Sequence, residues 1–119
     1  EKEDMRALLH AIHPSVDALA MANSIATRVK NEVGTLLFDG QPRGICGKAT
    51  LDASVEQTQL AHKIIKANEY ALELIGVGGA SCLEDIQRYL DAGAGAVHLA
   101  TAAMQNPDIA INIKAQAAR

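Results

Sequence analysis

Aromatic residues are scarce in this chain of 119 residues: tryptophan is absent, and Phe38, Tyr70 and Tyr89 are the only members of the Phe, Trp and Tyr class. Basic residues form no run or stripe, and fourteen acidic against eleven basic residues give a formal net charge of -3. Proteins that bind nucleic acids neutralise phosphates with clustered Lys and Arg and stack bases on aromatic rings. The composition therefore argues against a nucleic-acid partner.

Long apolar runs are also missing. No apolar stretch approaches the roughly 18 residues that a membrane-spanning helix requires, and the first four residues are all charged. We expect neither a membrane span nor a signal peptide. The two cysteines, Cys46 and Cys82, lack C-x-x-C spacing and are too few for a disulfide scaffold. The expected location is therefore the reducing cytoplasm.

The sequence is rich in alanine and has clustered glycines, and 49% of its residues are hydrophobic, enough for one soluble domain with a core. Helices are predicted at 3–12, 51–68, 81–92, 101–105 and 108–118, and strands at 16–22, 72–77 and 96–100. An S-x-x-E capping box, Ser81 to Glu84, is expected to open the third helix, and Gly93 to end it. Residues 25–50 show no clean periodicity, apart from a short strand or half hairpin predicted at 35–38.

Helices that alternate with short apolar strands predict an α/β fold with a parallel sheet. Right-handed crossovers place the carboxyl ends of all its strands on one side. That side is expected to collect Asn23-Ser24, Gly78-Gly79 and Ala100-Thr101.

The strongest motif is I-G-V-G-G at residues 75–79, followed by G-A-V-H-L-A-T-A at 95–102. Glycines directly after a parallel strand let the backbone approach an oxyanion, and (β/α)8 barrels hold phosphate after strands 7 and 8 in this way. Tight turns alone would also favour glycine. A dinucleotide fingerprint is a competing interpretation, but Ser81 stands where a smaller residue belongs, and no acidic residue ends the following strand.

Two further segments carry polar or flexible residues. Asn23 and Ser24 could hydrogen-bond a heterocycle, or simply form a turn. R-G-I-C-G-K-A at residues 43–49 precedes a helix, and Cys46 within it is interpreted as structural because no base is near it in sequence. The histidines have no metal-ligand spacing, so no metal site is predicted; His98 is expected to be a buried or barrel-interior residue.

These motifs, in this order from about Asp17 to Ala103, resemble the carboxyl-terminal part of the dihydroorotate dehydrogenase family of FMN-dependent (β/α)8 barrels. The resemblance implies that residues 1–119 are the carboxyl-terminal part of a single FMN-binding TIM-barrel domain. This part would hold about the last three β/α units of an incomplete barrel. The implied reaction of the parent enzyme is the oxidation of dihydroorotate to orotate in pyrimidine biosynthesis.

The resemblance also implies roles for individual residues. Asn23 and Ser24 would lie beside the pyrimidine substrate and the flavin ring. The FMN ribityl phosphate would be contacted by Gly44, Gly78, Gly79, Ala100 and Thr101. The sequence departs from the family pattern at Arg43, which replaces the first glycine of a G-G-x-x-G loop, and at His98, where Gln is usual.

A complete (β/α)8 barrel needs about 250 residues, and the catalytic base of the family precedes the segment seen here. No catalytic residue is therefore assigned, and the chain alone is expected to be inactive. It is expected to pair with a missing amino-terminal half or with a copy of itself. Three alternatives stay open: the pyrimidine-reducing domain of a dihydropyrimidine dehydrogenase, a non-flavin phosphate-binding lyase or isomerase, and a non-catalytic α/β interaction domain.

Overall fold

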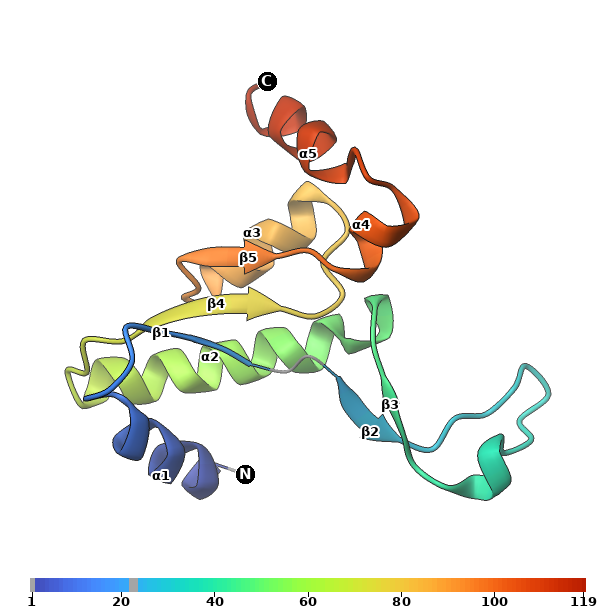
Figure 1. Ribbon diagram of the computed structural model, residues 1–119, viewed down its shortest axis with the longest axis horizontal. Coiled ribbons are helices and arrows are strands. Elements are labelled where there is room, and N and C mark those ends of the chain that lie inside the picture. Colours follow the sequence, from blue (N-terminus) through green and yellow to red (C-terminus); the bar gives the residue numbers. More distant parts are fainter. Residues whose placement is uncertain (1, 22–23) are drawn as a thin grey trace.

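The computed structural model describes residues 2–21 and 24–119 (Figure 1). Its elements are α1 (Lys2–Ile12), β1 (Ala18–Ala20), β2 (Ile25–Thr27), β3 (Arg43–Ile45), α2 (Leu51–Ala67), β4 (Glu73–Val77), α3 (Leu83–Asp91), β5 (Ala96–His98), α4 (Thr101–Gln105) and α5 (Ile109–Ala117). Short 3-10 turns lie at Phe38–Gly40 and Lys48–Thr50. No helix in the described ranges combines the length and apolarity that crossing a bilayer would need.

The main sheet is parallel, as predicted, and its strand order is β1-β4-β5. Ala20 pairs with Ile75, and Ile75 pairs with Ala96, so these side chains share one face. The opposite face carries Leu19, Leu74 and Val97, which pack against the helices. Helices cover only this second face, whereas parallel sheets are normally covered on both. The fold is an α/β unit with an open sheet, which is a portion of a barrel and not a closed one.

The core lies between the sheet and its helices. One buried cluster joins α1, α2, β1 and β4, and the other joins α2, α3 and β5. The buried members are Leu9, Ala61, Ile64, Ile65, Leu72 and Leu74 in the first cluster, and Leu51, Ala80, Tyr89 and Ala94 in the second. The predicted helices supply Leu9, Leu51, Ala61, Ile64, Ile65 and Tyr89, and the remaining core residues come from β4 and the adjoining loops.

Both central helices end in the same hydrogen-bond pattern. After α3, the N–H of Gly93 donates to Leu90 O and that of Ala94 to Tyr89 O, each at 3.0 Å. Gly93 has a φ of 102°, as a glycine stop requires. After α2 the same position is held by Glu69, with a φ of 53°. A side chain there is strained, because the left-handed region favours glycine.

Two local predictions were wrong and a third was incomplete. The segment 35–38, predicted as a short strand or half a hairpin, contributes only an antiparallel bridge between Leu36 and Lys30, and the hairpin strands around it pair Ile25 with Ile45. The capping box does not form: Cys82 is the cap residue of α3 and makes no side-chain capping bond. The strands of the sheet are also shorter than predicted, since β1 spans Ala18–Ala20 and β5 spans Ala96–His98.

The molecule is extended for its length. Its radius of gyration is 16.0 Å, against about 13.5 Å for a compact domain of this size. Its accessible surface is 7860 Å², about 1,700 Å² more than a compact monomer of this mass exposes. Figure 1 shows the reason: the β2–β3 hairpin and the α4–α5 segment project away from the sheet, the first beyond the β1 edge and the second beyond the β5 edge.

Candidate functional site

Three loops meet at the carboxyl ends of β4 and β5. They are the loop between β3 and α2, the loop between β4 and α3, and the loop between β5 and α4. Together they enclose a cavity of about 80 Å³, lined by Cys46, Gly47, Val77, Gly78, Gly79, His98, Ala100 and Thr101. At roughly 30 Å³ per water molecule, the cavity has room for a small oxyanion such as a phosphate group.

Gly79 brings the second loop against the first. Its φ is 74°, and a Cβ at this position would lie 2.7 Å from the carbonyl oxygen of Gly47 and 3.0 Å from the amide nitrogen of Leu51. Any side chain at residue 79 would therefore collide with backbone. Glycine is required here because the two backbones lie too close together to leave room for a side chain.

Gly47 brings the first loop against the third. It is buried, has a φ of 77°, and a Cβ there would lie 3.3 Å from Cγ2 of Thr101. Thr50 fixes the Gly47 carbonyl, because both its N–H and its hydroxyl donate to that oxygen at 2.9 Å. Sequence reasoning noticed the G-I-C-G-K-A segment but selected Gly44. The signal for Gly47 was its place directly before a helical turn.

The predicted site residues separate into two groups. The structure brings Gly78, Gly79, Ala100 and Thr101 together around the cavity, as predicted from the parallel direction of the strands. Gly44 instead lies on β3, where a Cβ would be 3.5 Å from the Ser24 hydroxyl oxygen. Gly44 and Ser24 are both exposed and are not among the lining residues. Asn23 lies outside the described residues, so the substrate-side assignment stays a prediction.

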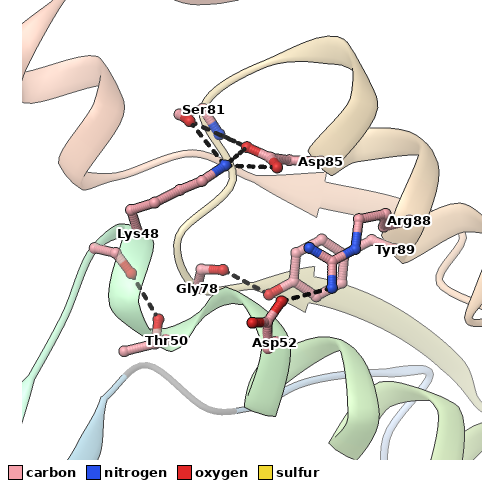
Figure 2. Close-up of polar contacts among 9 residues, drawn as sticks. Lys48, Thr50, Asp52, Gly78, Ser81, Asp85, Arg88 and Tyr89 are labelled. Atoms are coloured by element: carbon pink, nitrogen blue, oxygen red, sulfur yellow. Dashed lines mark hydrogen bonds and ion pairs between the residues drawn. The ribbon is translucent and has the colours of Figure 1, made fainter.

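An ion pair joins the first loop to helix α3 beside the cavity (Figure 2). Nζ of Lys48 donates to Oδ1 of Asp85 at 2.6 Å and to Oδ2 at 2.5 Å. The backbone N–H and the hydroxyl of Ser81 also donate to Oδ2, at 2.8 and 3.0 Å. Burial raises the pKa of Asp85, but the bonds from Lys48 and Ser81 outweigh it and hold the pKa at about 2. The carboxylate is therefore charged at every physiological pH.

Tyr89 supports the second loop from below. This fully buried residue of α3 donates its hydroxyl to the carbonyl of Gly78 at 2.7 Å (Figure 2). Its ring occupies the space beside Gly76, where a Cβ would lie 2.4 Å from Cδ1 of the ring. Gly76 is therefore needed to make room for the Tyr89 ring, and the hydrogen bond from Tyr89 fixes the distance between the Gly78 loop and helix α3.

A thiol and an imidazole also line the cavity. Cys46 and His98 are far apart in sequence, and the structure brings both to its wall. His98 is exposed on the uncovered sheet face, which agrees with the barrel-interior expectation and not with the buried one. The second cysteine, Cys82, is a poorer nucleophile, because burial raises the pKa of its thiol.

A larger hollow lies at the opposite, amino end of β4. It measures about 570 Å³ and is lined by parts of α2 and by residues 69–74 and Gly93. Size alone would favour it as the site. Ligands of barrels and open parallel sheets bind at the carboxyl ends of strands, however, and only the smaller cavity lies there with converging glycine backbone.

Comparison with known proteins gives a matching family model and several curated relatives. The family described as histidine biosynthesis protein matches residues 48–118. A dihydroorotate dehydrogenase of Dictyostelium discoideum is 29% identical over 109 residues, which cover 89% of this chain and 30% of that protein. The catalytic subunit of a dihydroorotate dehydrogenase B (NAD(+)) of Bacillus pumilus is 32% identical over 94 residues, covering 78% of this chain and 29% of that protein.

A solved structure extends the similarity to the fold. The crystal structure of DHODH from Eimeria tenella, in complex with ferulenol, superposes with a TM-score of 0.76 over 98% of this chain and 30% of that one. The sequences are 20% identical. The chain thus spans about 30% of the length of the curated relatives and of this structural neighbour.

Proposed function

We propose that this chain, which belongs to the dihydroorotate dehydrogenase family, is the part of an FMN-dependent dihydroorotate dehydrogenase that holds the phosphate of the cofactor. Its residues 48–118 also belong to the family described as histidine biosynthesis protein. The parent reaction is the oxidation of dihydroorotate to orotate in pyrimidine biosynthesis. The proposed location is the cytoplasm, in keeping with two cysteines that are both free.

The observation that carries the proposal is the convergence of three strand-end loops on a cavity the size of a phosphate. The absence of side chains at Gly47, Gly78 and Gly79 leaves backbone as the wall on one side. Thr101 adds a hydroxyl on the other. Main-chain amides and a hydroxyl are neutral donors, so they bind a phosphate dianion without adding a competing counter-ion.

The proposed roles of the other residues follow from the family resemblance. The FMN ring would extend from the phosphate over the uncovered sheet face, toward Ser24 and Asn23, which would hydrogen-bond the pyrimidine. Bound FMN would supply the hydride acceptor. The base that removes the substrate C5 proton is not assigned to a residue of this segment, because Ser24 and Thr101 have no activating partner among the contacts described. The chain alone is therefore proposed to be inactive.

The histidine biosynthesis match favours a second candidate, a phosphate-binding barrel without flavin. That match covers residues 48–118, which hold the Gly78-Gly79 loop and Thr101 but not Gly47. The curated dehydrogenases extend the similarity to 89% of the chain. We therefore place the dehydrogenase first. The alternative function, that of the pyrimidine-reducing domain of a dihydropyrimidine dehydrogenase, would use FMN as well and would differ from the proposed function in its substrate.

Binding of FMN compared with riboflavin tests the proposal, because riboflavin lacks only the phosphate. Flavin fluorescence is titrated with the purified chain. One charge-assisted hydrogen bond contributes about 1.5–3 kcal/mol, so FMN should bind at least about tenfold more tightly than riboflavin. Equal affinity, or no binding of either flavin, would remove the flavin-phosphate role and leave the non-flavin barrel as the better candidate.

A further inference from the structure

The Lys48–Asp85 ion pair lies where the two glycine loops meet. Lys48 directly follows Gly47, and Ser81, which donates twice to Asp85, lies two residues after Gly79. The pair therefore closes a ring of contacts that runs from the first loop through Asp85 and Ser81 to the second. The other side of this ring is the close approach of Gly79 to the Gly47 carbonyl.

The burial of the two partners is unequal. The side chain of Asp85 is 6% exposed and that of Lys48 is 61% exposed. A nearly buried carboxylate needs its hydrogen-bond donors, since an unpaired buried charge is strongly unfavourable. Asp85 thus holds Lys48 and Ser81 in place, and it cannot release one of them without a cost.

Lys48 does not act here as a phosphate ligand. Both of its short contacts go to the Asp85 carboxylate, and its third is a 3.5 Å contact with the Ser81 hydroxyl. The charge of the ammonium group is therefore largely compensated before any ligand arrives. What the pair controls is the spacing of the glycine backbones, not the local charge.

We propose that Asp85 and Lys48 are positioning residues, which set the distance between the Gly47 and Gly79 loops and thereby make the cavity selective for a phosphate group. This inference rests on the proposed function, since it assumes that the cavity binds the phosphate of FMN. It assigns the selectivity to two side chains that are not among the residues lining the cavity.

The test measures the ratio of FMN to riboflavin affinity in Asp85→Asn, which keeps the shape of the side chain and removes its charge. The control is Asp52→Asn. Asp52 also pairs with a cation of α3, Arg88, at 2.7 Å, but its side chain is 82% exposed and does not contact the loops. We expect the ratio to fall about tenfold or more in Asp85→Asn and to stay at the unmodified value in Asp52→Asn.

The possible outcomes separate the two proposals. A ratio near one in the unmodified chain overturns the proposed function itself. A high ratio that persists in Asp85→Asn overturns only the positioning role. An equal loss of FMN and riboflavin affinity also overturns it, because general loosening of the fold does not depend on the phosphate.

Two more variants keep the test independent of folding. If circular dichroism shows that Asp85→Asn is unfolded, Lys48→Met replaces it, because Lys48 is exposed outside the core and Asp85 keeps its two hydrogen bonds from Ser81. Lys48→Met should lower the same ratio, and Lys48→Arg should restore it. A Lys48→Met chain that is folded and keeps the unmodified ratio contradicts the inference.

Discussion

At the residue scale, the site depends on two glycines, Gly47 and Gly79, at which no side chain fits, and on the buried charge of Asp85. Gly47 and Gly79 adopt left-handed backbone and touch neighbouring chain segments. Asp85 receives hydrogen bonds from two loops while almost completely buried. These three positions determine how close the loops come, and each can be tested by a single substitution.

Gly79→Ala should weaken FMN binding at least about tenfold, because the new Cβ would lie 2.7 Å from the Gly47 carbonyl oxygen and force the loops apart. Gly34→Ala is the matched control. Gly34 has a similar φ of 85°, but nothing lies within 4 Å of its Cβ position. It therefore reports the backbone strain alone. Equal FMN affinity in both variants, measured by fluorescence titration, would exclude Gly79 from the site.

The Asp85 carboxylate should make stability depend on acidic pH. Its pKa is held at about 2, below the ordinary 3.8, so the folded state binds the proton less readily than the unfolded state. The resulting stabilisation, about 2 kcal/mol, is fully present above pH 4 and is lost as the pH falls from 4 to 2. Urea unfolding across this range should show the loss in the unmodified chain. Asp85→Asn should lack this component, whereas Asp52→Asn should retain it.

At the element scale, the carboxyl ends of α2 and α3 differ in backbone strain. The glycine stop of α3 is free of strain, whereas the same turn after α2 holds Glu69 at a φ of 53°. The hydrogen bonds are otherwise alike, since Tyr70 N–H donates to Ile65 O at 3.1 Å, as Ala94 N–H does to Tyr89 O. The α2 terminus is therefore a place where one substitution can relieve strain.

Glu69→Gly should stabilise the chain by about 1 kcal/mol, because glycine adopts left-handed backbone without strain. Glu56→Gly is the opposite control. Glu56 is exposed in the middle of α2, where glycine costs about 1 kcal/mol. Thermal unfolding followed by circular dichroism should move in opposite directions for the two variants. A lower midpoint for Glu69→Gly would contradict the strain argument.

At the scale of the whole molecule, the uncovered sheet face and the two open sheet edges dominate. β1 and β5 each have only β4 as a strand neighbour in the described sheet, and the exposed surface exceeds that of a compact monomer by about 1,700 Å². An excess of this size is comparable to the area that a stable protein interface buries. We therefore expect the chain to have a partner, either the rest of a barrel or a second copy of itself.

The chain on its own should self-associate as its concentration rises and should bind a hydrophobic dye. Ala96→Lys places a charge on the uncovered face, where the Ala96 side chain is exposed, and should shift the protein toward monomer. Gln59→Lys, on the exposed surface of α2, should leave association unchanged. Sedimentation velocity distinguishes them. A folded monomer that binds no dye at high concentration would contradict the expected partner.

The sequence by itself determined the helices, the parallel direction of the strands and the position of Gly78, Gly79, Ala100 and Thr101 at one edge of the sheet. These features depend on local periodicity and on chain direction, which neighbouring residues encode. Only the tertiary structure revealed the Ile25–Ile45 pairing, the role of Gly47 and the Lys48–Asp85 pair. Each joins residues 20 or more positions apart in segments too short to carry a period, so the contact exists only after packing brings the loops together.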